Sequence, residues 1–212
     1  MSVAQFPIVP AKTAMLFFDT LNTYLHPEDS ATKTAVEQSG VLQAMQKINQ
    51  ACRKAGVTIV YAQADHRPDF RDFASHIVDR GYQSSSAEPY RTKPPAVVAD
   101  SLAAEIVPEL APQPGDYVIK KHRWSSFFQT HLELSLRTAG IDTIMLAGGS
   151  TEVGIASTAY AARDMDFNLI ILRDACRSGR PGVDQFFAEQ VFPVLARVMS
   201  VDQAIGAIQG AG

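Results

Sequence analysis

Short apolar runs alternate along the chain with longer amphipathic stretches, and several of these runs end at a polar or charged residue. A short apolar run bounded by turn residues is typical of a buried strand. The predicted strands cover residues 14–18, 57–62, 117–121, 142–147, 168–172 and 197–201.

The stretches between these runs carry helical spacing. In the first of them apolar residues recur at intervals of three and four, Cys52 lies on the apolar face as a core residue, and Gly56 follows as a stop signal. Thr130 and Glu133 form a capping-box pattern, which predicts a helix start. The predicted helices cover residues 34–55, 101–110, 130–140, 153–165 and 183–195, with one more at the C-terminus.

Strands that alternate with helices at this spacing predict an α/β fold. Such folds are three-layer α/β/α structures, in which helices cover both faces of a parallel, Rossmann-like sheet. At 212 residues the chain is long enough to bury a single core, and we interpret residues 1–212 as one domain. Residues 68–95 have poor periodicity, and we expect them to form a surface excursion near the site.

Composition narrows the classes of partner. A net charge of −3 lacks the excess of positive charge that is typical of proteins that bind nucleic acid or an anionic membrane. No apolar run approaches the roughly 18 residues of a membrane helix, and the N-terminal residues do not resemble a signal peptide. Two cysteines make neither a disulfide framework nor a zinc cluster. We therefore expect a cytoplasmic protein.

The sequence between 146 and 162 organises the predicted site. Gly148 and Gly149 allow a sharp turn between a strand and a helix, and Ser150 and Thr151 stand where a hydroxyl can cap that helix. The helix N-terminus then presents free N–H groups at the carboxyl end of a strand, where α/β proteins bind small polar or anionic ligands. An ordinary strand-to-helix turn explains the same residues equally well.

Two charged residues end other strands at the same edge of the sheet. Asp19 follows the first strand and Lys121 ends the third. Burial raises the pKa of a carboxyl group and a nearby ammonium lowers it, so such a pair can hold or release a proton. A structural salt bridge is the alternative.

The motifs together resemble the isochorismatase-like hydrolase superfamily. They are Asp19-x-x-Asn22, Lys121-His-Arg-Trp-Ser-Ser-Phe127 with Thr130, Gly148-Gly-Ser-Thr-Glu-Val-Gly-Ile-Ala-Ser-Thr158, and Asp174-Ala175 with Ser178. The resemblance covers residues 13–201 and implies a parallel six-stranded sheet, a small-molecule substrate, no cofactor, and a homo-oligomer, either a dimer or a tetramer. Most relatives are amidases that use an Asp, a Lys and a Cys. The acid falls on Asp19 and the lysine on Lys121, but the thiol position is Gly154.

The glycine leaves three hypotheses open. In the isochorismatases proper, glycine at this position leaves space, and a protonated acid starts the hydrolysis of a vinyl ether. By that resemblance Asp19 is a proton donor acting on an enol ether such as isochorismate. The second hypothesis is C–N hydrolysis of an amide or ureide by Asp19-activated water, and the third is a catalytically silent binding homologue. Cys176 is another candidate nucleophile nearby in the sequence, but it follows a different strand.

The resemblance also suggests which residues line the substrate pocket. This chain departs from the isochorismatases proper at Leu21, where they often have Gln, and at Trp124-Ser-Ser-Phe127. Asp65 and His66 are adjacent rather than spaced as a metal-binding Asp-x-His pair, so we predict no metal site. The predicted substrate-binding residues are Asn22, Gln63, Trp124, Phe127, Gly149, Ser150 and Thr151.

Overall fold

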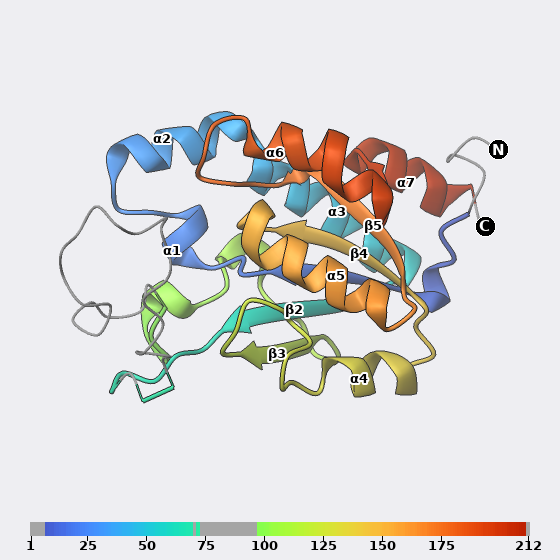
Figure 1. The fold of residues 1–212 in the computed structure, drawn as a ribbon, viewed down its shortest axis with the longest axis horizontal. Helices are drawn as coiled ribbons and strands as arrows, with labels where there is room; N and C mark the ends of the chain where they lie inside the picture. Colours follow the sequence, from blue (N-terminus) through green and yellow to red (C-terminus); the bar gives the residue numbers. More distant parts are fainter. Residues whose placement is uncertain (1–6, 70, 73–96, 211–212) are drawn as a thin grey trace.

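The computed structural model describes residues 7–69, 71–72 and 97–210, and its centre is a parallel sheet of six strands (Figure 1). Most of the predicted excursion at 68–95 lies outside the described residues. The strand order is β3-β2-β1-β4-β5-β6, and every neighbouring pair is parallel. The strands are β1 (Thr13–Phe18), β2 (Thr58–Ala64), β3 (Tyr117–Lys121), β4 (Thr143–Gly148), β5 (Asn168–Cys176) and β6 (Arg197–Met199).

Helices cover both faces of the sheet, so the predicted three-layer α/β/α, Rossmann-like fold is confirmed. Alternate residues of β1 point into two separate cores. Met15 and Phe17 pack with α3 (Val41–Ala55) and α7 (Val201–Gln209), whereas Leu16 and Phe18 pack with α4 (Leu132–Thr138) and α5 (Ala156–Asp164). In Figure 1 α5 crosses one face of the sheet and α3 lies behind it.

The predicted helix at 34–55 is wrong in one respect, because it is two helices. Asp29 caps α2 (Ser30–Ser39) by accepting a hydrogen bond of 2.7 Å from the Thr32 N–H. Gly40 then adopts φ +68°, a left-handed conformation that ends α2 before α3 begins. Gly56 ends α3 in the same way, as predicted.

The predicted helix at 101–110 is also wrong. This segment forms two 3₁₀ turns, η5 (Leu102–Ala104) and η6 (Pro108–Leu110). Its backbone pairs instead with the loop after β1, where the Val107 N–H donates to the Thr20 carbonyl and Leu21 bridges to Ile106. That loop contains a short helix, α1 (Asn22–Leu25), where the sequence predicted only a polar loop.

Three other predicted helices differ from the structure, one because it is divided and two because of how they begin. Residues 183–195 divide into α6 (Val183–Phe186), the π-helical turn η8 (Phe187–Val191) and the 3₁₀ turn η9 (Phe192–Val194), which contains a proline. The capping box at 130–133 is not formed, because α4 starts at Leu132 and Thr130 Oγ1 donates to the Ser126 carbonyl. The helix after β4 begins with a wider π-helical turn, η7 (Thr151–Ile155).

Candidate active site

Asp19 and Lys121 form a buried ion pair at the carboxyl edge of the sheet. They come from β1 and β3, which flank β2, so the pair meets over the end of the strand between them. Asp19 Oδ2 accepts from Lys121 Nζ at 2.8 Å, and Asp19 Oδ1 accepts from the Ala64 N–H at 2.8 Å. The exposed fractions of the two residues are 8% and 4%. The predicted convergence of these two side chains is therefore what the structure shows, although their role stays a prediction.

Burial sets the proton affinity of this pair. It raises the pKa of Asp19 above the ordinary value of 3.8, although Lys121 and the Ala64 N–H both act to lower it. The carboxyl group of Asp19 thus keeps a proton to higher pH than an exposed aspartate does. Tyr24 is 42% exposed, but desolvation of its hydroxyl raises the pKa of the phenol, and the charge of Asp19 adds to the increase. Tyr24 is a neighbour of the pair that sequence reasoning missed.

The turn after β4 approaches the end of β1 very closely. Gly148 has φ +129°, and a Cβ atom on it would lie 2.0 Å from the Phe18 carbonyl oxygen. The Gly149 N–H donates to that same oxygen at 3.3 Å, and the Gly149–Ser150 peptide bond is cis. Only glycine fits at 148 because the turn comes this close to Phe18. The turn therefore lies beside Asp19, the next residue after Phe18.

The polar residues of the turn have structural partners. The Thr151 hydroxyl donates to Asp184 Oδ1, which also accepts from the Ser178 N–H at 2.8 Å. Ser150 precedes η7, but its side chain makes no capping hydrogen bond, so its predicted role as a cap is wrong. Substrate contacts by Gly149, Ser150 and Thr151 stay predictions.

The space beside Gly154 is occupied by the ring of Phe18. A Cβ atom on Gly154 would lie 2.1 Å from Phe18 Cε1 and 2.4 Å from Cζ. The expectation that Gly154 leaves space for a ligand is therefore wrong in this structure, because an aromatic side chain from β1 fills it. This contact could not be predicted from the sequence, in which Phe18 is one more apolar residue of a strand.

Cys176 is buried at the end of β5, where its Sγ contacts the Leu146 carbonyl oxygen at 3.8 Å. Burial raises the pKa of its thiol well above the usual range. Cys52 lies on the buried face of α3, within the core, and burial raises its pKa to about 12. Neither sulfur is in the thiolate form that nucleophilic attack requires at neutral pH.

Both thiols are accordingly expected to be unreactive in the folded protein. At pH 7.5, a disulfide reagent that releases a coloured thiolate should react more than tenfold faster with the urea-unfolded chain than with the native chain, because burial suppresses both ionisation and access. Peptide mapping after brief iodoacetamide treatment checks the two sites separately. Rapid native labelling of Cys176 would restore it as a candidate nucleophile.

Two predicted substrate-binding amides, Asn22 and Gln63, both bond to the backbone of η5. Asn22 Nδ2 donates to the Leu102 carbonyl at 2.9 Å, and Gln63 Nε2 donates to the Ala104 carbonyl at 2.6 Å. They join the loop after β1 and the end of β2 to the segment that precedes β3. A direct contact with substrate stays a prediction for both.

The two predicted aromatic pocket residues differ in environment. Phe127 is 7% exposed and packs in the core, with its ring 5.9 Å from that of Phe167. Trp124 is 57% exposed. The structure thus gives Phe127 a packing role, and a substrate contact by Trp124 stays a prediction.

A histidine cluster adjoins the ion pair and was not predicted as a unit. His66 Nδ1 lies 3.1 Å from Asp72 Oδ2, and His122 Nε2 lies 3.9 Å from the same oxygen. Burial lowers the pKa of His66 despite the neighbouring carboxylate. Within the described ranges, no group of three or more His, Cys, Asp or Glu residues is arranged to hold a metal ion. The absence of a metal site stays a prediction.

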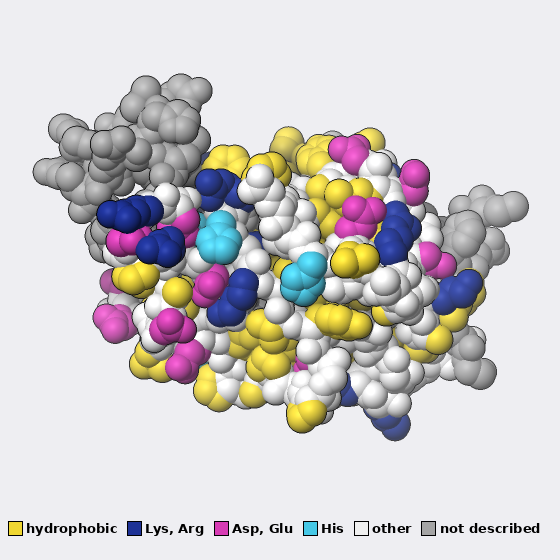
Figure 2. Space-filling view, turned by 90° about the horizontal axis from the view of Figure 1, so that it is seen from below, with side chains coloured by type: hydrophobic (Ala, Val, Ile, Leu, Met, Phe, Trp, Pro, Cys, Tyr) yellow, Lys and Arg dark blue, Asp and Glu magenta, His cyan; other side chains and the backbone are white. Residues whose placement is uncertain are grey.

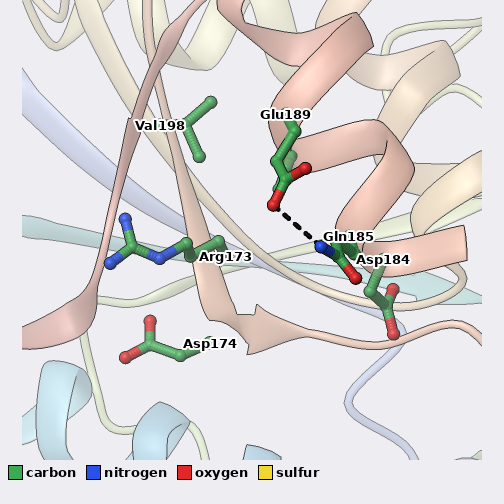
Figure 3. Close-up of a pocket in the computed structure, with 7 residues that line it drawn as sticks. Arg173, Asp174, Asp184, Gln185, Glu189 and Val198 are labelled. Carbon is green, nitrogen blue, oxygen red and sulfur yellow. Dashed lines mark hydrogen bonds between the residues drawn. The ribbon is translucent and has the colours of Figure 1, made fainter. Parts of the chain in front are cut away.

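A separate cavity of about 570 Å³ opens between β5 and α6 (Figure 3). Arg173 and Asp174 approach it from β5, and Glu189 from the helical side accepts from Gln185 Nε2 at 3.0 Å. Asp174 also accepts from the Val201 N–H and so caps α7. None of the predicted site residues lines this cavity.

Figure 2 shows a face on which acidic, basic and histidine side chains are interspersed with hydrophobic ones, without a continuous patch of one charge sign. Among the described residues, none of the helices combines the length and the apolar character of a membrane span.

Comparison with known proteins identifies relatives along nearly the whole chain. The model of the isochorismatase domain family matches residues 13–203. The uncharacterized isochorismatase family protein YecD of Escherichia coli O157:H7 is 32% identical over 160 residues, which are 76% of this chain and 84% of that protein. The ureidoacrylate amidohydrolase RutB of Azorhizobium caulinodans is 30% identical over 179 residues, 80% of this chain and 78% of that protein. Among solved structures, an isochorismatase-like hydrolase from Alkaliphilus metalliredigens is 29% identical, with a TM-score of 0.76 over 92% of this chain and 98% of its own.

Proposed function

The chain belongs to the isochorismatase family of hydrolases, and we propose that it hydrolyses a small polar molecule with water as the direct nucleophile and Asp19 as the proton-transfer group. The observation that carries this proposal is the buried ion pair, in which Asp19 and Lys121 lie 2.8 Å apart at the edge of the sheet. Glycine at position 154 offers no side-chain nucleophile, and this supports a mechanism in which the attacking oxygen comes from water.

The bond class that the comparisons favour is a C–N bond of an amide or ureide. Six of the relatives carry the name ureidoacrylate amidohydrolase, and their matches cover about four fifths of this chain. In this reaction the Asp19 carboxylate removes a proton from water, and the water oxygen attacks the carbonyl carbon. The C–N bond then breaks, the nitrogen takes the proton from Asp19, and an amine and a carboxylic or carbamic acid leave. The Lys121 ammonium holds the carboxylate in place and offsets its negative charge.

An enol ether is the second candidate, and the raised pKa of Asp19 favours it. Because burial raises the pKa of this carboxyl group, a protonated and donating form is accessible to it. Asp19 would give its proton to the enol carbon, and water would add to the resulting oxocarbenium ion while it returns a proton to the Asp19 carboxylate. The neutral hemiketal would then separate into a carbonyl compound and an alcohol. This route needs no thiol either.

The direction of the pH profile separates the two candidates. For C–N hydrolysis Asp19 acts as a base, so kcat/KM should rise as pH increases through its pKa. For enol-ether hydrolysis it acts as an acid, so kcat/KM should fall over the same range, which lies above 3.8. The measurement is a screen of ureides, amides and enol ethers for released ammonia, amine or carbonyl product, followed by a pH series on any substrate found. Absence of turnover with all three classes would favour a silent binding homologue.

A small-molecule substrate and a homo-oligomer remain part of the proposal. Trp124 and Phe128 are 57% and 52% exposed on the loop between β3 and α4, and exposed aromatic side chains are common at protein interfaces.

A further inference from the structure

Phe18 links the ion pair to the glycine at position 154. It is the last residue of β1, its side chain is buried, and it directly precedes Asp19. Three of its ring atoms, Cδ1, Cε1 and Cζ, lie 2.9 Å or less from where a Cβ atom on Gly154 would be. Gly154 itself has an ordinary negative φ, so a side chain at 154 is excluded by this ring and not by the backbone conformation.

The same ring also contacts the lysine. Lys121 Nζ lies 4.1 Å from the centroid of the Phe18 ring, well inside the roughly 6 Å range of cation–π attraction. This contact is shielded from water, because Phe18 is 2% exposed and Lys121 is 4% exposed. The ammonium is therefore held by two groups from consecutive residues, the face of Phe18 and the carboxylate of Asp19.

We propose that Phe18 is a positioning residue, whose ring fills the space over Gly154 and holds the ammonium of Lys121 against Asp19. Its catalytic meaning rests on the proposed function, in which Asp19 moves the proton. The contacts of the Phe18 ring with Lys121 and Gly154 do not depend on the proposed function, because they exist without a substrate. The proposal also makes Phe18 and Gly154 a matched pair, so that a thiol side chain at 154 requires a smaller residue at 18.

The positioning role is tested by Phe18→Leu, with Phe17→Leu as a matched control. Both variants remove one buried aromatic ring from β1, but Phe17 points into the other core, where it stacks on Tyr61 at 5.5 Å. Loss of the cation–π contact should let the ammonium leave Asp19, and the pKa of Asp19 should then rise by about one unit. Carboxyl ¹³C NMR titration measures this shift, with Asp19→Asn assigning the signal.

Access to the lysine gives a second readout. Acetic anhydride should modify Lys121 about tenfold faster in Phe18→Leu than in the parent or in Phe17→Leu, as measured by peptide mass spectrometry. Phe17→Leu should lose comparable stability with neither change. Equal effects from the two variants, or an unchanged Asp19 titration in Phe18→Leu, would reduce Phe18 to a packing residue and overturn the proposal.

The matched pair is tested by a double-mutant cycle in urea unfolding. Gly154→Cys alone should lower the unfolding midpoint sharply, because its Cβ overlaps the ring. Phe18→Val removes the three overlapping ring atoms, so the double variant Phe18→Val/Gly154→Cys should unfold at higher urea than Gly154→Cys alone. Combining Gly154→Cys with Phe17→Val should give additive losses instead. Additivity in both combinations would disprove the pairing.

These measurements do not depend on turnover. If they succeed while no substrate is found, the ring contacts stand and the proposed function fails. If they fail while Asp19 proves essential for hydrolysis, the function stands and the role assigned to Phe18 falls.

Discussion

Asp19→Asn is expected to lower kcat/KM by on the order of 10²–10⁴-fold while the protein stays folded. Asparagine has nearly the volume of aspartate but cannot take up or release the proton. It also has a single side-chain oxygen, so it keeps a bond to either the Ala64 N–H or Lys121 Nζ, whereas Asp19 accepts from both. Kinetics on whichever substrate the screen identifies, together with circular dichroism and urea unfolding, separates lost chemistry from lost folding.

Asp65→Asn is the matched control for that variant. Asp65 follows β2 at the same edge of the sheet and pairs with Lys120, the residue next to Lys121, at 3.1 Å. That pair is partly exposed, with side-chain exposed fractions of 46% for Lys120 and 24% for Asp65. An exposed pair contributes little to stability, about 1 kcal/mol at most. Asp65→Asn should keep nearly full activity, and full activity in Asp19→Asn would eliminate the proposed mechanism.

The sheet and the meeting of Asp19 with Lys121 could be predicted because both follow from local patterns. Each strand is a short apolar run, and parallel strands bring their carboxyl ends to one edge. The order β3-β2-β1-β4 then places β1 and β4 side by side where the strand order reverses. That arrangement puts Asp19 beside the Gly148 turn, although Lys121 has to reach it across the end of β2.

The rest of the site could not be predicted, because it depends on contacts between distant segments. Gly40 could have signalled the break between α2 and α3, but the apolar spacing continued through it. The segment at 101–110 departs from a helix because its backbone pairs with residues 20–22. Above all, nothing in a strand sequence shows that the ring of Phe18 lies where a side chain at 154 would stand.

The proton affinity of Asp19 is likewise a property of the fold. A sequence can show that an acid follows an apolar run, but the direction of its pKa depends on how far burial outweighs Lys121 and the Ala64 N–H. In this structure burial is the larger effect and the pKa is raised. The raised pKa also determines how the contribution of Asp19 to folding stability changes with pH, because the folded state holds this proton more tightly than the unfolded chain does. The contribution of Asp19 is most favourable below its unfolded pKa, and it is lost as pH rises through its folded pKa.

Gly148→Ala is expected to destabilise the fold by more than about 4 kcal/mol, at the upper end of single-substitution effects. Its Cβ atom would lie 2.0, 2.8 and 2.9 Å from the O, C and N atoms of Phe18, all of them backbone atoms. These atoms cannot move away without breaking the pairing of Phe18 with Gly148 between β1 and β4, and that movement would also displace Asp19. Urea unfolding monitored by circular dichroism measures the loss.

Gly115→Ala separates this overlap from the cost of the backbone conformation. Gly115 also has a positive φ, +98°, but a Cβ atom there would meet nothing within 4 Å. Its substitution should therefore cost only the conformational strain, about 1–3 kcal/mol. The difference between the two variants isolates the close approach of the β4 turn to β1. If the two losses were equal, that approach would not be what requires glycine at 148, and the turn could be moved without disturbing Asp19.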